Sequence, residues 1–159
     1  MKVREVMTKQ ATFCYPDTSL SGAAELMWKR KCGFLPVRGE GGNIIGVITD
    51  RDIGIALGTR NRRPSEVLVK DVMSGRLFTC TAEDSVACAL TTMRIEGLRR
   101  LPVIDREGAL VGVLSIDDLV LKARENAFRN DVSYKDVEDT YKAIYGHAAR
   151  AGKTGSLAA

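Results

Sequence analysis

The sequence has almost none of the residues from which metal sites and nucleophilic active sites are usually built. It contains one histidine, His147, and four cysteines, none of which forms a C-x-x-C pair. A zinc site of cysteine and histidine needs four ligands at tight spacing, so the composition argues against a resident metal. We expect Cys14, Cys32, Cys80 and Cys88 to be reduced, buried thiols of a cytoplasmic protein.

Long apolar runs and aromatic residues are also scarce. No run approaches the roughly 20 apolar residues that span a membrane, and aromatics make up 6% of the 159 residues. A content of 45% hydrophobic and 28% charged residues is ordinary for a soluble protein. The length allows one compact domain or two small coupled ones. The net charge of +4 suits an anionic small ligand but does not require one.

The sequence does contain an internal repeat. The run Gly46-Val47-Ile48-Thr49-Asp50-Arg51-Asp52 is echoed from Gly112 to Asp118, at an offset of 112 − 46 = 66 residues. At this offset, 14 of the 51 pairs between Val3–Ile53 and Val69–Leu119 are identical. One supersecondary unit is therefore used twice. Because the first repeat begins at Val3, we expect no signal peptide.

Each repeat is predicted to have the order β-α-β-β-α, which gives an α+β fold. Apolar periodicity, cap residues and glycine-rich turns define the elements. In the first repeat they are Ala11–Tyr15, Ser19–Lys31, Phe34–Arg38, Ile44–Ile48 and Asp50 or Arg51 to Leu57. In the second they are Leu77–Thr81, Ser85–Glu96, Arg100–Ile104, Leu110–Leu114 and Asp117 to about Arg129. The predicted domains are repeat 1 (1–60), linker and repeat 2 (61–129), and a C-terminal helix with a flexible tail (130–159).

The C-terminal helix is predicted to begin at Ser133-x-x-Asp136, which is a typical helix start. Val137, Tyr141, Ile144 and Tyr145 then form one apolar face. This face needs a partner, either the body of the protein or a second subunit. We expect Ala151–Ala159 to be disordered.

The duplicated pattern resembles the paired cystathionine-β-synthase (CBS) domain, also called the Bateman module. Both repeats carry a Val-x-x-Val-Met-Thr/Ser lead-in, a Leu-Pro-Val strand, a Gly-x-Val/Leu/Ile strand and a Thr/Ser-x-x-Asp helix start, over residues 3 to about 125. The resemblance implies two βαββα units with two clefts between them. It also implies adenosine ligands such as AMP, ADP or ATP, with S-adenosylmethionine and NAD(H) as further candidates. Such modules commonly act as sensors and pair through their helices, so the resemblance implies a homodimer. It implies no metal beyond Mg²⁺ carried by the nucleotide.

The helix starts at Thr49-x-x-Asp52 and Ser115-x-x-Asp118 allow two interpretations. Each sequence is close to a capping box, which would serve only the helix. The same geometry offers backbone N–H groups for a phosphate and a carboxylate for two adjacent ribose hydroxyls. By resemblance these four residues bind ribose and phosphate, and Thr8 of the lead-in joins them.

The basic residues predict that the two sites differ. The resemblance places phosphate contacts before each Leu-Pro-Val strand, where repeat 1 has Arg30 and Lys31. Arg51 adds a further charge inside the Thr-Asp-Arg-Asp turn, where repeat 2 has Asp117. Repeat 2 supplies only Arg99 and Arg100. We therefore predict that the Asp52 site accepts more phosphate charge than the Asp118 site.

The resemblance also implies that adenine lies against the first strand of the other repeat. This would place Ala11, Thr12 and Phe13 beside Asp118, and Leu77, Phe78 and Thr79 beside Asp52, with Val37 and Val103 as further wall residues. The alternative for all of them is an ordinary core position.

The leading functional hypothesis is a stand-alone adenine-nucleotide-binding regulatory module that acts on a partner in trans. The first alternative is a ligand-free protein–protein interaction module with the same fold. An enzyme is disfavoured because the sequence shows no nucleophile–base pair and no metal set. Arg60, Arg62 and Arg63 suggest nucleic-acid binding as a further alternative, but no aromatic residues are interleaved with them.

Overall fold

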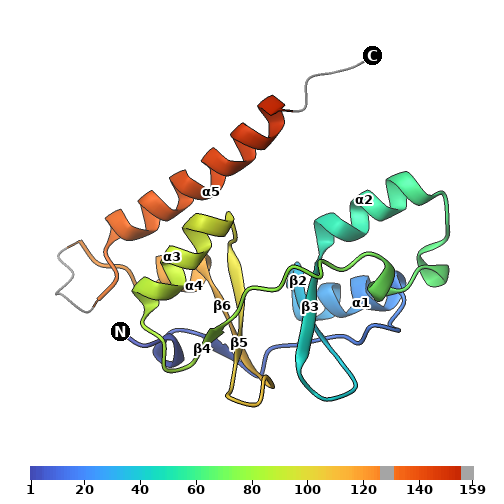
Figure 1. Ribbon diagram of the computed structural model, residues 1–159, viewed down its shortest axis with the longest axis horizontal. Helices are drawn as coiled ribbons and strands as arrows, with labels where there is room; N and C mark the ends of the chain where they lie inside the picture. Colours follow the sequence, from blue (N-terminus) through green and yellow to red (C-terminus); the bar gives the residue numbers. More distant parts are fainter. Residues whose placement is uncertain (126–130, 155–159) are drawn as a thin grey trace. The chain divides into compact units, whose positions relative to one another are not determined.

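The computed structural model describes residues 1–125 and 131–154. Its helices and strands follow the predicted repeat, as Figure 1 shows. The first repeat contains β1 (Thr8–Lys9), α1 (Leu20–Arg30), β2 (Phe34–Arg38), β3 (Ile44–Thr49) and α2 (Asp50–Arg60). The second contains β4 (Cys80–Thr81), α3 (Val86–Glu96), β5 (Arg100–Ile104), β6 (Leu110–Ser115) and α4 (Ile116–Val120). Helix α5 (Tyr134–Thr154) follows, and short 3₁₀ turns η1 (Val3–Glu5), η2 (Pro64–Glu66) and η3 (Val69–Asp71) lie in the lead-ins and the connector. Among the described helices, none is long and apolar enough to cross a membrane.

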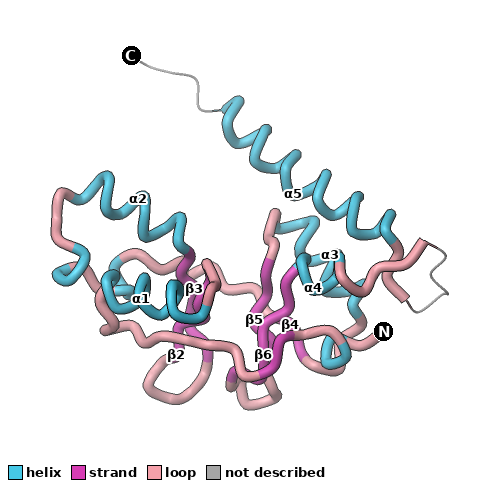
Figure 2. The backbone as a smooth tube through the Cα atoms, turned by 180° about the vertical axis from the view of Figure 1, so that it is seen from behind, coloured by secondary structure: helices cyan, strands magenta, loops and turns pink. Residues whose placement is uncertain are grey.

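The chain forms two compact units, each of which combines parts of both repeats. Unit 2 contains residues 10–77 and 104–111, and unit 1 contains residues 1–9, 78–103 and 112–159. The lead-in of each repeat therefore belongs to the unit built from the body of the other repeat. Figure 2 shows the strands and helices from the opposite side.

Unit 2 is built on the antiparallel hairpin of β2 and β3, in which Leu35 pairs with Ile48 and Val37 with Gly46. Alternate residues of β3 are buried, as expected for a strand with one face on the core. Helices α1 and α2 begin at side-chain caps from Ser19 and Thr49. Buried side chains from α1, β2, β3, α2 and the second lead-in form one hydrophobic cluster.

Unit 1 contains a four-stranded sheet in the order β1-β6-β5-β4. Helix α3 is capped by Ser85, and α4 by Ser115. Helix α5 packs on α3 and α4. Its cap is Ser133, whose Oγ accepts from the Asp136 N–H at 3.1 Å, so the predicted helix start is confirmed. The body of the protein thus covers Val137 and Ile144 of the predicted apolar face, each 7% exposed, whereas Tyr145 is 58% exposed.

The two lead-ins dock by equivalent backbone hydrogen bonds. Val3 N–H donates to the Asp84 carbonyl at 3.0 Å, and Val69 N–H donates to the Thr18 carbonyl at 2.8 Å. Both valines are fully buried. Each lead-in then runs antiparallel beside a strand, with Thr8 next to Gly112 of β6 and Ser74 next to Gly46 of β3. The repeated glycine of the sequence is therefore the point where the backbone of the lead-in comes closest to the strand.

Five local predictions are wrong. Of the strand predicted over Leu77–Thr81, only Cys80–Thr81 (β4) is a strand. Ala11–Tyr15 is not a strand: Gln10 has a left-handed φ of 54°, and only Cys14 forms an isolated bridge. The closing helix of repeat 2 ends at Val120, because Arg124 N–H donates to the Val132 carbonyl instead of continuing the helix. The end predicted for it, near Arg129, lies outside the described residues.

Helix α2 runs to Arg60, three residues past the predicted end at Leu57. Helix α5 runs to Thr154, so residues 151–154 of the predicted disordered tail are helical, and residues 155–159 lie outside the described residues. In both cases an established helix continues past the predicted end, because adding a residue to a formed helix costs far less than starting a new one.

Candidate functional site

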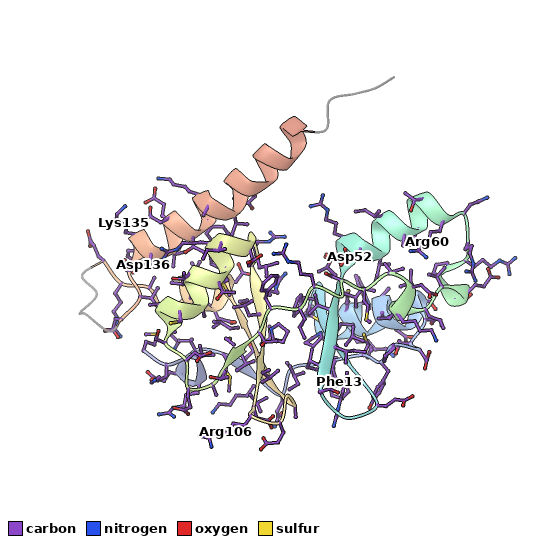
Figure 3. All side chains as sticks on the ribbon, viewed as in Figure 1. Phe13, Asp52, Arg60, Arg106, Lys135 and Asp136 are labelled. Carbon is purple, nitrogen blue, oxygen red and sulfur yellow. The ribbon has the colours of Figure 1, made fainter. Side chains whose placement is uncertain are left out.

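The Asp52 centre consists of Thr49 and Asp52 at the start of α2, where Figure 3 labels Asp52. Asp52 Oδ2 accepts from the Thr49 N–H at 2.8 Å and from the Thr49 hydroxyl at 2.7 Å. Thr49 Oγ1 in turn accepts from the Asp52 N–H at 3.2 Å. Both of these hydrogen bonds to the carboxylate use Oδ2. The carboxylate is therefore held to Thr49 through one of its two oxygens.

The Asp118 centre repeats this arrangement with Ser115 and Asp118. Asp118 Oδ2 accepts from the Ser115 N–H at 2.9 Å and from the Ser115 hydroxyl at 2.8 Å. Its Oδ1 faces the hydroxyl of Thr8 at 3.5 Å, which is at the limit of a hydrogen bond. Thr8, Ser115 and Asp118 thus lie close together in unit 1.

Both interpretations of the motif can therefore apply to the same residues. The capping box is formed in each centre, and it occupies Oδ2 and the hydroxyl. One carboxylate oxygen has two lone pairs and can accept from two adjacent hydroxyls. Each aspartate can therefore hold its helix end through Oδ2 while Oδ1 receives a ligand.

Ser74 is a residue near the Asp52 centre that was missing from the predicted site. It pairs with Val47 of β3, and its hydroxyl donates weakly to the Arg76 carbonyl at 3.5 Å. The offset of 66 residues matches Ser74 with Thr8, so the repeat contained the signal that could have found it.

The cations predicted for the Asp52 site are all solvent-exposed. Arg30 ends α1, Lys31 is its left-handed C-cap with φ 52°, and Arg51 lies in the first turn of α2. Lys31 and Asp50 line an apolar groove of about 870 Å³ between α1 and α2, but Asp52 does not line it.

The charges beside Asp118 are arranged differently. Arg100 lies 3.5 Å from Asp117, and the Tyr141 hydroxyl of α5 donates to the same carboxylate at 3.0 Å. Burial and Asp117 both raise the pKa of Tyr141. Arg99 is exposed. Part of the positive charge predicted for this site is therefore offset by Asp117, a contact that local sequence patterns could not reveal.

The predicted adenine-wall residues are divided between the units. Ala11, Thr12, Phe13 and Leu77 belong to unit 2, and Phe78 and Thr79 belong to unit 1, so their union with the opposite aspartate stays a prediction. Phe13, labelled in Figure 3, stacks under the Arg38 guanidinium at 5.2 Å and meets Tyr15 edge-on. Val37 and Val103 are fully buried, so their side chains are core side chains.

The remaining candidate groups are the possible metal ligands, the cysteines and the arginines of the connector. Within residues 1–125 and 131–154, no group of three or more His, Cys, Asp or Glu side chains is arranged to hold a metal. Burial raises the pKa of Cys14 to about 11 and that of Cys80 to about 12, so both are protonated thiols at neutral pH. Cys32 is half-buried and Cys88 is exposed, so the prediction that all four cysteines are buried is wrong. Arg60 and Arg62 donate to the carbonyls of Asp71 and Glu66 at 2.7 and 2.6 Å.

Similar proteins include both small and large chains. The CBS domain-containing protein YhcV of Bacillus subtilis is 33% identical over 124 residues, covering 78% of this chain and 86% of that protein. The protein MK0525 of Methanopyrus kandleri is 29% identical over 120 residues, covering 76% of this chain and 61% of that one. The chain spans only 24% of the matched homoserine O-acetyltransferase of Methanohalophilus mahii.

Two solved structures are similar and contain adenosine compounds. The CBS domain pair of MJ0100, in complex with 5′-methylthioadenosine and S-adenosyl-L-methionine, has a TM-score of 0.70 at 22% identity and covers 76% of this chain and 94% of that one. CBSX2 in complex with AMP has a TM-score of 0.64 at 25% identity and covers 76% of this chain and 93% of that one. The profile of the CBS domain matches residues 3–57 and 69–125. This chain therefore belongs to the CBS domain family, with two tandem repeats and an additional C-terminal helix.

Proposed function

We propose that the chain is a non-enzymatic regulatory module that binds adenosine nucleotides at the Asp52 and Asp118 centres. The observation that carries this proposal is the duplicated aspartate, which is held by a capping box through Oδ2 and keeps Oδ1 for a ligand. An aspartate held in this way is pre-oriented, so little rotamer entropy is lost when ribose hydroxyls bind. The AMP of CBSX2 and the adenosine compounds of the MJ0100 domain pair support an adenosine ligand.

The two centres favour different phosphate charge. Helix α2 has 11 residues and presents Arg51 in its first turn, whereas α4 has 5 residues and presents Asp117. A longer helix and a cation both favour an anion at the helix start. We therefore assign AMP, ADP or ATP to the Asp52 centre, with Arg30, Lys31 and Arg51 near the phosphates. The Asp118 centre, where Arg100 already pairs with Asp117, suits a ligand with less charge.

The signal is proposed to pass to another protein through a change of conformation or of assembly between two copies of the chain. A ligand shifts such an equilibrium only by its preference for one of the states. The adenine would lie against Ala11–Phe13 at the Asp118 centre and against Leu77–Thr79 at the Asp52 centre. Backbone groups of these segments would make most of the contacts that recognise it.

Thermal melts with AMP, ADP, ATP, S-adenosylmethionine and NADH test this proposal, with GTP as the control ligand. A ligand at 100 times its dissociation constant adds about 2.7 kcal/mol to the folded state. At about 2–4 °C per kcal/mol for a chain of this size, the melting temperature rises by about 5–10 °C. Asp52→Asn is the sharpest variant, because an amide oxygen can still accept from Thr49 while a donor replaces the free oxygen. Asp118→Asn is its matched control at the second centre.

A ligand-free interaction module is the second candidate, because both capping boxes are complete without any ligand. The two candidates predict different melts. A rise with one adenosine compound, reduced in Asp52→Asn or Asp118→Asn, supports the nucleotide module. Unchanged melts with all five compounds contradict it and support the interaction module.

A further inference from the structure

Helix α5 belongs to unit 1 but lies outside the two matched repeats. The family profile ends at residue 125, before α5 begins. The helix packs on α3 and α4, as Figure 1 shows. Arg94 of α3 donates to the Thr140 hydroxyl at 2.8 Å, and Thr140 is fully buried. Val137 and Ile144 of α5 are buried as well. Helix α5 is therefore an integral part of unit 1 that has been added to the repeats.

One contact of α5 reaches the first turn of α4, next to Asp118. The Tyr141 hydroxyl donates to Asp117 Oδ1 at 3.0 Å, and Arg100 Nη2 lies 3.5 Å from Asp117 Oδ2. One carboxylate thus binds α5 through one oxygen and the predicted phosphate contact Arg100 through the other. The side chain of Asp117 is 65% exposed. It can therefore change partners without leaving a buried, unpaired charge.

A phosphate at the start of α4 would disturb both contacts of Asp117. It would compete for Arg100, because a guanidinium pairs with a carboxylate or a phosphate in the same way. It would also repel the Asp117 carboxylate, since the two groups have charges of the same sign. The carboxylate would then turn away, and its bond to Tyr141 would be lost. An uncharged group in place of the phosphate has neither effect.

We propose that Asp117 selects against phosphate at the Asp118 centre and that Tyr141 is the positioning residue that holds it there, so that a seated α5 and a phosphate-bearing ligand oppose each other. This inference rests on the proposed function and names the ligand charge and the regulation of one of its two centres. Coupling between two equilibria is reciprocal: the ligand weakens the seating of α5 by the same factor by which the seated helix weakens the ligand. Helix α5 is thus the element that responds to the charge of the ligand.

AMP and 5′-methylthioadenosine are the matched probes, because they share adenosine and differ in a charged phosphate against an uncharged thioether. Titration calorimetry of the full chain carrying Asp52→Asn measures the Asp118 centre. Asp117→Ala is expected to tighten AMP about fivefold relative to 5′-methylthioadenosine. Tyr141→Phe is expected to tighten it about twofold, and to have no further effect in the Asp117→Ala chain. Tyr145→Phe is the matched control: it removes a hydroxyl from the ring stacked on Tyr141 at 6.2 Å and is expected to leave the affinity ratio unchanged.

Hydrogen exchange of the α5 amides measures the reciprocal effect in the same Asp52→Asn chain. At equal saturation, exchange from Tyr141 onward is expected to be about twofold faster with AMP than with 5′-methylthioadenosine. In Tyr141→Phe the two ligands are expected to give equal rates, because the bond that AMP breaks is already absent.

The outcomes separate this inference from the proposed function. An affinity ratio that stays the same in Asp117→Ala or Tyr141→Phe, a ratio that changes in Tyr145→Phe, or equal exchange rates with the two ligands each overturns the inference and leaves the proposed function standing. Failure of both ligands to bind the Asp52→Asn chain, or binding that persists when Asp118→Asn is added, overturns the proposed function at this centre and the inference with it.

Discussion

Gly46 tests the docking of the second lead-in most directly. A Cβ at this position would lie 2.8 Å from the Ser74 carbonyl oxygen and 3.1 Å from Met73 Sδ. The first contact is with backbone, which cannot rotate away as a side chain can. Gly46→Ala must therefore push Ser74 off β3, although alanine otherwise suits a strand at least as well as glycine.

The expected cost can be worked from the contacts that are lost. Overpacking in a buried site costs about 1–3 kcal/mol. The lead-in also loses the Val47 N–H to Ser74 carbonyl bond of 3.3 Å and the Ser74 N–H to Val47 carbonyl bond of 2.9 Å, each worth about 1 kcal/mol or less. We expect Gly46→Ala to lower the free energy of unfolding by about 2–4 kcal/mol. This corresponds to a melting temperature lower by about 5–15 °C.

Urea unfolding at 25 °C measures this change as a shift in midpoint at constant slope. Gly58→Ala is the matched control, because Gly58 lies in α2 with nothing within 4 Å of an added Cβ, and alanine there is expected to add about 0.5–1 kcal/mol. Limited proteolysis of Gly46→Ala is expected to cut first within residues 69–77. A Gly46→Ala variant as stable as the wild type would refute the close approach of the lead-in to β3.

Three further changes test other contacts. Ser133→Ala removes the cap of α5 and should lower the free energy of unfolding by about 1 kcal/mol, measured by urea unfolding; an unchanged midpoint contradicts the cap. Tyr141→Phe removes the hydrogen bond to Asp117 and should speed amide hydrogen exchange in α5, whereas equal exchange rates would show that the bond contributes nothing to its seating. Because burial raises the pKa of Cys14 from 9.0 to about 11, its contribution to stability is full below pH 9.0 and declines between pH 9.0 and about 11, as the unfolded thiol ionises first. At pH 8, a thiol reagent should label the exposed Cys88 rapidly and Cys14 only after unfolding; equal labelling rates would contradict the burial of Cys14.

Local signals in the sequence were enough to predict most of the secondary structure. The caps Ser19, Thr49, Ser85, Ser115 and Ser133 all accept from a backbone N–H three residues on. This holds because capping depends only on residues within one turn. The Leu-Pro-Val strands also have the predicted bounds, since their glycine-rich turns define both ends.

The error at the closing helix of repeat 2 occurs where a later segment decides the local structure. Residues 121–125 continue a helical pattern, yet Arg124 bonds to Val132 across a segment that no periodicity could anticipate. The docking of each lead-in on the other repeat has the same cause, because Val3 meets Asp84 and Val69 meets Thr18. Tertiary contacts of this kind override local propensity.

The candidate site was predicted in its centre and less well at its edges. The pairs Thr49–Asp52 and Ser115–Asp118 are held together by the predicted motif itself. Next to Asp118, the carboxylate of Asp117 accepts a hydrogen bond from Tyr141. Tyr141 lies 24 residues beyond Asp117, in a helix outside the repeats. No spacing rule within the repeat could have supplied that contact.

The lead-in of each repeat packs on the body of the other repeat, so one repeat by itself lacks the lead-in that completes its unit. A chain with a single repeat would need the lead-in of another copy, and its folding would depend on concentration. Joining two repeats turns that association into an intramolecular step with an effective concentration on the order of millimolar. A chain cut in the connector between α2 and η2 would leave two fragments, and each fragment would carry the lead-in that packs on the body of the other. We expect such fragments to reassemble one to one, as halves of a single interlocked fold.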